Sequence, residues 1–247
     1  MRFQDAARDA RAVVYAGIQA DPLVARVAGL LATASYGQRL MARAVMNGES
    51  AEAATWRAMF PTVLGPDVPD REGAEAILAA ALAVACRGEE VRSQLRGAIV
   101  EALAEVLVAR RTGPAAVRRE RRILFDGVRA EIHPYDLTVE TPGREEAWDC
   151  KWGARGINAD VLNQLDDARR HAAAEETRLR AGLVVYDLRG SCALRLAEQT
   201  APTAGTIVIT LESLDALAGV KATPAGAKAA TPGGSVTPPP GSNSAPG

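Results

Sequence analysis

Apolar residues recur at helical spacing through the first third of the chain. After Asp21-Pro22, apolar residues stand at positions 23, 24, 27, 30 and 31. Aspartate caps a helix well and proline fits the first helical position, so this dipeptide predicts the start of a helix. The alanine-rich run 74–85 is too short to span a membrane and predicts a buried helix. We therefore expect residues 1–88 to form an entirely α-helical module.

A longer helix is predicted over residues 89–111, where positions 91, 95, 99, 103 and 107 place apolar side chains along one face. Thr112-Gly113-Pro114 ends it, because glycine accepts a left-handed cap and proline cannot continue the helix. Beyond this point the apolar period shortens to two. Residues 122–125, 133–140 and 145–152 therefore predict three strands, separated by turns rich in Gly, Pro and Asp.

The pattern then predicts the last ordered elements: a helix over 159–179, strands over 182–187 and 206–210, and a short helix ending at Gly219. We expect an α/β domain over residues 89–219, with the order α-β-β-β-α-β and a central mixed sheet flanked by helices. From residue 220 onward Ala, Pro, Gly, Ser and Thr dominate without an apolar period. Such a segment buries too little surface to offset its ordering entropy, so 220–247 are expected to form a disordered tail.

Composition narrows the function classes. With 48% hydrophobic and 24% charged residues, the chain has the balance of a soluble globular protein. Its net charge of −1 means that the protein as a whole does not attract a polyanion electrostatically. Any affinity for nucleic acid must therefore come from local basic clusters. The three cysteines are widely spaced and have no zinc-site spacing, and the N-terminus lacks the apolar core of a signal peptide. We expect a cytoplasmic protein that does not cross a membrane.

Candidate chemistry lies in the strand predicted over 145–152. Its apolar residues at positions 148, 150 and 152 can enter the core, which leaves Asp149 and Lys151 side by side on the opposite face. In the preceding strand, Asp136 also lies on the polar face. If the two strands pair as a hairpin, Asp136 and Asp149 come close. Two close carboxylates repel each other unless a cation lies between them, and Mg²⁺ favours such oxygen ligands.

A third acid precedes these strands on the long helix. Glu101 lies off the apolar face, and its helical neighbours at positions 97, 98 and 104 are Gly, Ala and Ala. Small neighbours allow the helix to approach the sheet closely and to direct the carboxylate toward a metal. Glu105, one turn further on, is the substitute for this role.

This order of residues resembles the PD-(D/E)XK, or restriction-endonuclease-like, nuclease superfamily over about residues 92–210. Glu101 matches the helix acid of that family, Asp136 matches the first strand acid, and Asp149 with Lys151 matches the D-x-K pair. The resemblance implies the fold described above and a metal-dependent phosphodiesterase activity.

The resemblance also implies roles for these residues. Asp136, Asp149 and the backbone carbonyl of Cys150 would hold Mg²⁺, for which Mn²⁺ is the expected substitute, and Glu101 would reach a first or second ion through water. Lys151 would orient or help to deprotonate the attacking water and offset charge in the transition state.

The helix that follows carries Gln164, which resembles the glutamine of the RecB-like and junction-resolvase-like branches and would position Lys151 or a phosphate. The alternative is a solvated helix glutamine. Two departures stand out: Tyr135, not proline, directly precedes Asp136, and Ala168 stands where those branches place a tyrosine.

Six arginines join the long helix to the first strand: Arg110, Arg111, Arg118, Arg119, Arg121 and Arg122. Beside a phosphodiesterase site, such a basic run is interpreted as a phosphate-binding surface. The alternative is a solvated loop whose charges complement the end of the helix.

The sequence thus predicts a Mg²⁺-dependent nuclease with a role in restriction, repair or defence, with DNA favoured over RNA as substrate. The helical module would read the substrate, bind a partner protein or form a homodimer. Two alternatives remain open: a catalytically inactive nuclease-fold module that binds nucleic acid or protein, and a nuclease that cleaves RNA.

Overall fold

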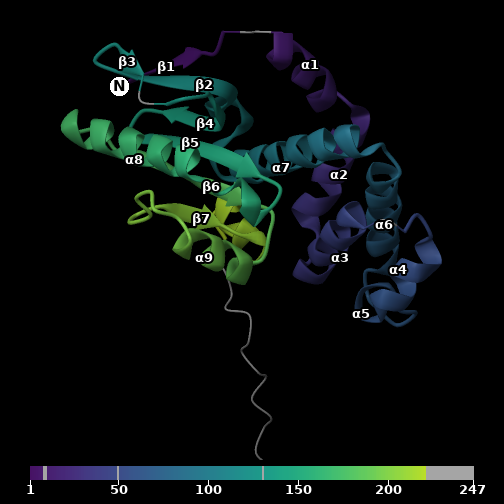
Figure 1. Ribbon diagram of the computed structural model, residues 1–247. Helices are drawn as coiled ribbons and strands as arrows, with labels where there is room; N and C mark the ends of the chain where they lie inside the picture. Colours follow the sequence, from purple (N-terminus) through teal and green to yellow (C-terminus); the bar gives the residue numbers. More distant parts are fainter. Residues whose placement is uncertain (8–9, 49, 130, 221–247) are drawn as a thin grey trace, which may run out of the picture.

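The computed structural model describes residues 1–7, 10–48, 50–129 and 131–220 (Figure 1). Within them the chain is an α/β protein, in which an N-terminal helical region is followed by a mixed sheet with flanking helices; the described strands of this sheet number seven. The disordered tail predicted over 220–247 lies outside the described residues, apart from Val220. No helix in the described part of the chain is long and apolar enough to cross a membrane.

Local capping explains where several N-terminal helices begin. The helices are α1 (Ala10–Gln19), α2 (Pro22–Thr33), α3 (Tyr36–Asn47), α4 (Ala53–Met59), α5 (Pro61–Leu64) and α6 (Arg71–Ala85). Asp21 caps α2 by accepting a hydrogen bond from the backbone N–H of Leu23, 2.8 Å away. Ser35 and Gln38 form a capping box at the start of α3.

The prediction that the first 88 residues are entirely helical is wrong at one end. Residues Arg2–Asp5 form strand β1, which pairs antiparallel with strand β2 (Val117–Phe125) and joins the sheet. The four residues are too few to show an alternating pattern, and their conformation depends on a partner more than a hundred positions away. Whether the 1–88 segment folds independently stays a prediction.

The sheet follows the long helix α7 (Glu89–Thr112). The remaining strands are β3 (Val128–Arg129), β4 (Tyr135–Thr141), β5 (Arg144–Lys151), β6 (Leu179–Val185) and β7 (Ile207–Ile209). Their spatial order is β1-β2-β4-β5-β6-β7, with β3 paired to β2. The neighbours from β1 to β5 are antiparallel, whereas β5 pairs parallel with β6, and β6 with β7. The crossover from β5 to β6 is made by helix α8 (Ala159–Ala174).

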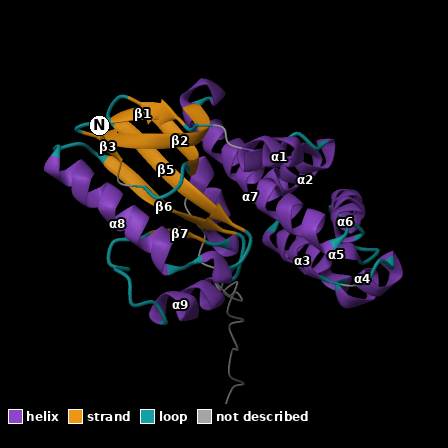
Figure 2. Ribbon diagram, turned by 45° about the horizontal axis from the view of Figure 1, so that its top comes forward, coloured by secondary structure: helices purple, strands orange, loops and turns teal. Residues whose placement is uncertain are grey.

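Two apolar layers enclose the sheet. Helix α7 packs on one face, with N-terminal helices α1 and α2 packed on α7 in turn, and Leu103, Leu137 and Trp148 belong to a single buried cluster there. Helix α8 covers the other face, where Leu165 and Leu183 belong to a second cluster. Figure 2 shows these helices on either side of the strands. The α/β arrangement predicted for the later part of the chain is confirmed at this level.

Element boundaries differ from the prediction in several places. Strand β2 begins at Val117, five residues before the predicted start, and α8 ends at Ala174 rather than at residue 179. Helix α9 (Arg189–Ala197) was not predicted, and the last helix (Leu211–Ala218) is of the 3-10 type. The start of β2 consists largely of arginines, so it shows no alternation of apolar and polar residues. This part of the strand was therefore predicted to be a charged loop.

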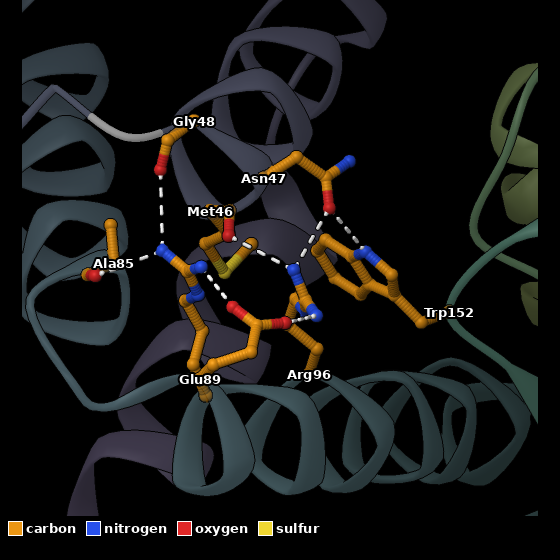
Figure 3. Close-up of polar contacts among 8 residues, drawn as sticks. Met46, Asn47, Gly48, Ala85, Glu89, Arg96 and Trp152 are labelled. Atoms are coloured by element: carbon orange, nitrogen blue, oxygen red, sulfur yellow. Dashed lines mark hydrogen bonds and ion pairs between the residues drawn. The ribbon is translucent and has the colours of Figure 1, made fainter.

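A polar cluster joins the helical region to the end of the central strand (Figure 3). The indole nitrogen of Trp152 donates to Asn47 Oδ1 at the end of α3, and Arg96 of α7 donates to the same oxygen over 3.2 Å. The Arg96 guanidinium lies 5.8 Å from the centre of the Trp152 ring. The ring of Tyr186 stacks on Trp152 with 5.2 Å between the ring centres. Trp152, which directly follows Lys151, therefore contacts residues of both α3 and α7.

Candidate functional site

The pairing of β4 with β5 brings Asp136 and Asp149 together. Leu137 lies opposite Trp148 in this antiparallel ladder, so the same register places Asp136 opposite Asp149 one residue further on. The backbone N–H of Cys150 donates to Asp136 Oδ2 over 2.6 Å, which fixes that carboxylate against β5. The hairpin that the sequence suggested therefore exists, and its two acids lie at the same end.

Strand β4 changes the layer into which its apolar side chains pack at this point. Tyr135 and Leu137 are two residues apart in β4, yet Tyr135 packs in the α8 layer and Leu137 in the α7 layer. Asp136, between them, lies where the strand changes faces. In β2 the facing residue is Glu120, which lies between the paired positions Arg119 and Arg121 and has a left-handed φ of 53°. Such a conformation is strained for a non-glycine residue and is concentrated at functional sites.

Lys151 provides the positive charge of the cluster. Its Nζ lies 3.8 Å from Asp149 Oδ1 and 3.9 Å from Asp136 Oδ2. Burial by itself lowers the pKa of this amine, but Asp136 and Asp149 outweigh that effect, so the pKa of Lys151 lies above its usual value. The two carboxylates therefore favour the ammonium form, which can stabilise negative charge and donate hydrogen bonds.

Glu101 reaches the same region from α7. Its side chain is buried and accepts two hydrogen bonds from α1, one from the Tyr15 hydroxyl to Oε1 over 2.5 Å and one from Gln19 Nε2 to Oε2 over 2.8 Å. Burial, and next the charge of Asp136, raise the pKa of Glu101. The small neighbours at positions 98 and 104 are fully buried, in agreement with the close approach of α7 to the sheet.

Asp149 is the most constrained acid of the cluster. It is 0% exposed, and neither of its carboxylate oxygens has a hydrogen-bond partner. Burial, with the charge of Asp136 as the next cause, raises its pKa, whereas Lys151 lowers it. A buried acceptor without a donor costs free energy, and a cation that binds these oxygens removes that cost.

These residues fit a divalent cation in donor type and charge. Glu101, Asp136 and Asp149 bring three carboxyl groups together against the single ammonium of Lys151, and the two unpaired oxygens of Asp149 are the hard ligands that Mg²⁺ prefers. Within the described residues, however, no three His, Cys, Asp or Glu side chains converge on one point as a preformed metal centre. Binding an ion at this place therefore requires the side chains to move, with Lys151 withdrawing from between the carboxylates.

Two residues that are not among the predicted site residues, Glu120 and His133, belong to this cluster. Glu120 is half-buried, and burial followed by the charge of Asp136 raises its pKa. His133 places Nδ1 4.0 Å from Asp149 Oδ1. An available signal for Glu120 was its position as the sole acid within a run of arginines, and for His133 its closeness to Asp136 in the sequence. Neither signal is specific.

Gln164 is buried in helix α8. It is 1% exposed, so the alternative of a solvated glutamine is wrong. Its Oε1 accepts hydrogen bonds from the backbone N–H groups of Ile132 (3.1 Å) and His133 (3.3 Å). Gln164 therefore holds the loop that carries His133 toward Asp149. A contact with Lys151 or with a phosphate stays a prediction.

Most arginines of this run form hydrogen bonds or ion pairs with other elements of the fold. The partners are the Ala32 carbonyl for Arg110, Glu146 for Arg111, Glu105 for Arg119, Asp5 and Glu140 for Arg121, and Glu131 for Arg122. Arg118 is exposed and donates to the carbonyl of its neighbour Val117 over 2.9 Å. Arg110 is also exposed, whereas the Arg111 guanidinium is buried. Phosphate binding by this run stays a prediction.

Comparisons of the chain with protein-family models, with curated proteins and with solved structures find no match. The geometry of the acid cluster therefore carries the functional argument.

Proposed function

We propose that this protein is a Mg²⁺-dependent nuclease with a restriction-endonuclease-like core of the PD-(D/E)XK kind. The observation that carries the proposal is Asp149, whose two buried carboxylate oxygens lack hydrogen-bond donors while Asp136 and Lys151 lie beside it. The order α7, β2, β4, β5, α8, β6 supports the proposed core, because it places a helix acid, a strand acid and a D-x-K pair around one end of the sheet.

The acids of the cluster and Lys151 would have different roles. Asp136, Asp149 and the carbonyl of Cys150 would hold the ion, and Glu101 would contact it directly or through water. A divalent cation bound there would lower the pKa of an attacking water and stabilise the leaving oxygen. Lys151, as an ammonium ion, would donate to a non-bridging phosphate oxygen and stabilise the negative charge of the transition state.

Nucleic acid is the proposed substrate, with DNA favoured over RNA, and the proposed setting is restriction, repair or defence. The support is chemical: a cation site framed by carboxylates beside a fixed ammonium ion suits phosphodiester hydrolysis. A catalytically inactive module is favoured instead by one observation, namely that Lys151 lies between Asp136 and Asp149 without a preformed metal centre.

One experiment separates these possibilities. Supercoiled plasmid, single-stranded DNA and RNA of matched sequence are incubated with the wild type, Asp149→Asn and Lys151→Met in Mg²⁺ or Mn²⁺. Asp67→Asn, at an exposed loop position, is the control. We expect cleavage by the wild type and the control and a loss of at least about a hundredfold in the two site variants.

The outcomes have distinct meanings. Cleavage of RNA alone would replace DNA by RNA as the substrate. Equal cleavage by the wild type and by Asp149→Asn would remove the proposed site. Absence of cleavage, together with absence of metal binding in calorimetry, would leave the inactive binding module.

A further inference from the structure

A cavity of about 620 Å³ lies between α1 and the paired ends of β1 and β2. Sites for small molecules and nucleotides commonly have volumes of about 300–1,000 Å³. The cavity is lined on one side by α1, including Val13 and Ala16, and on the other by Arg119, Arg122 and Pro134. None of the roles proposed above uses it.

The cavity adjoins the acid cluster through shared residues. Tyr15 and Gln19 line the cavity, and both donate hydrogen bonds to Glu101. Glu120 also lines the cavity, and it lies opposite Asp136 in the sheet. A ligand that fills the cavity would therefore contact Glu120 directly and would be separated from Glu101 only by the side chains of Tyr15 and Gln19.

The lining fits a neutral group better than a phosphate. Its arginines already have acidic partners: Arg119 Nε lies 2.9 Å from Glu105 Oε2, and Arg122 lies 3.6 Å from Glu131. Asp5 and Glu120 also line the cavity, so its charges balance. Apart from Gln19, the remaining wall is apolar or aromatic, with Val13, Pro134 and Tyr15 among its residues. Such surfaces can stack against a base, and guanidinium planes can add a cation–π contact.

We propose that this cavity receives the base and sugar of one nucleotide next to the phosphate that reacts at the acid cluster. The inference rests on the proposed nuclease function and deepens it. A base inside a cavity cannot remain stacked and paired in a duplex. The substrate class is therefore a strand that is unpaired at the cleavage position, such as single-stranded DNA or a strand end.

Two neighbouring valines provide a matched test. Val13 lines the cavity and is 61% exposed, whereas Val14 does not line it and is 64% exposed. Because both side chains are largely exposed, we expect glutamate at either position to leave the fold intact. Val13→Glu places a carboxylate at the cavity, where it opposes an incoming nucleotide, and Val14→Glu adds the same charge outside it.

The binding experiment uses fluorescence anisotropy with a labelled single-stranded DNA of twelve nucleotides and its duplex, in EDTA so that neither is cleaved. We expect the wild type to bind the single strand at least about tenfold more tightly than the duplex. Val13→Glu should weaken single-strand binding about tenfold, and Val14→Glu should change it less than about twofold. Ala16→Phe, which fills the cavity without adding charge, should act like Val13→Glu.

Cleavage assays with the same variants separate this inference from the function on which it rests. If the wild type cleaves DNA but Val13→Glu and Val14→Glu bind and cleave alike, the cavity is not the nucleotide site, and the nuclease function stands. If nothing is cleaved but Val13→Glu alone loses single-strand binding, the cavity binds nucleic acid and the nuclease function fails. Preference of the wild type for the duplex would overturn the unpaired-strand inference directly.

Discussion

Trp152 Nε1 lies 2.8 Å from Asn47 Oδ1, and this hydrogen bond connects the end of α3 to the residue that follows Lys151. The same asparagine oxygen accepts from Arg96, so three elements meet at one acceptor. The position of Lys151 thus depends on α3, whose Asn47 lies 105 positions before Trp152 in the sequence, and on α7.

Trp152→Phe tests this connection. The phenyl ring can keep the stack on Tyr186 but has no N–H group to donate to Asn47. We expect the free energy of unfolding to fall by about 1 kcal/mol, the usual contribution of one hydrogen bond, as measured by urea denaturation. Asn47→Ala should lower it by more, because it removes the acceptor of both Trp152 and Arg96. Equal stability of the wild type and both variants would show that the contact contributes nothing.

The buried pair of Arg111 and Glu146 should make stability depend on acid pH. Burial by itself raises the pKa of Glu146, but hydrogen bonds from Arg111 and Trp148 outweigh burial and hold it below its usual value. The folded state then binds fewer protons than the unfolded state around pH 4. The stabilisation is therefore present above the unfolded pKa of about 4.3 and is lost as the pH falls through the folded pKa.

Glu146→Gln isolates that effect. Removing one partner of a buried ion pair leaves Arg111 uncompensated, so we expect a loss of about 3 kcal/mol at pH 7 in urea denaturation. The difference from the wild type should shrink between about pH 5 and pH 3, because the wild type loses its own ion pair there. Glu145→Gln, one residue earlier in β5, is the control and should follow the wild type. A difference that stays constant with pH would contradict the assignment.

Binding of a divalent cation should stabilise the wild type through Asp149. A ligand present at about a hundred times its Kd adds about 2.7 kcal/mol to the free energy of unfolding. We expect Mn²⁺ or Mg²⁺ to raise the Tm of the wild type and of Asp67→Asn, and EDTA to reverse the rise. Asp149→Asn should show no rise. In EDTA near pH 8 it should be at least as stable as the wild type, since it removes a buried carboxylate whose oxygens have no hydrogen-bond partner. A rise in Tm of Asp149→Asn equal to that of the wild type would place the ion elsewhere.

Glu120 combines backbone strain with a position in the acid cluster, and paired substitutions separate the two. Glycine adopts a φ of 53° without penalty, whereas alanine does not, so Glu120→Ala should be less stable than Glu120→Gly by about 1 kcal/mol in urea denaturation. Both variants lack the carboxylate and should lose at least about tenfold in cleavage rate if that group acts at the site. Asp126→Gly, also at a positive φ but in an exposed turn, should keep full activity. Full activity of Glu120→Gly would assign Glu120 a purely structural role.

The sequence predicts those parts of the site that depend on local pattern. Alternation along β5 separates Asp149 and Lys151 from Trp148 and Cys150, and the short turn before β5 suggests the hairpin that carries Asp136. Both conclusions follow from two local features: the alternation of side chains along one strand, and pairing with the strand that precedes it in the sequence.

The other members of the cluster depend on contacts between distant segments. Tyr15 and Gln19 contact Glu101 across more than eighty residues, and nothing in their own helix distinguishes them from solvent-facing side chains. The strand β2 was predicted too short because its first arginines are polar on both faces. Arg119 and Arg121 form ion pairs with acids of α7, β1 and β4. The local sequence of β2 does not show these partners.

The pairing of β1 with β2 has a consequence for biosynthesis. Arg2 lies opposite Leu124, so the first strand leaves the ribosome long before its partner exists. Helices α2 to α6 can form from local contacts in that interval, but β1 must wait for more than a hundred further residues to be translated. Because α1 follows β1 in the sequence and holds Tyr15 and Gln19 against Glu101, the segment that returns late to the sheet also contributes side chains to the acid cluster.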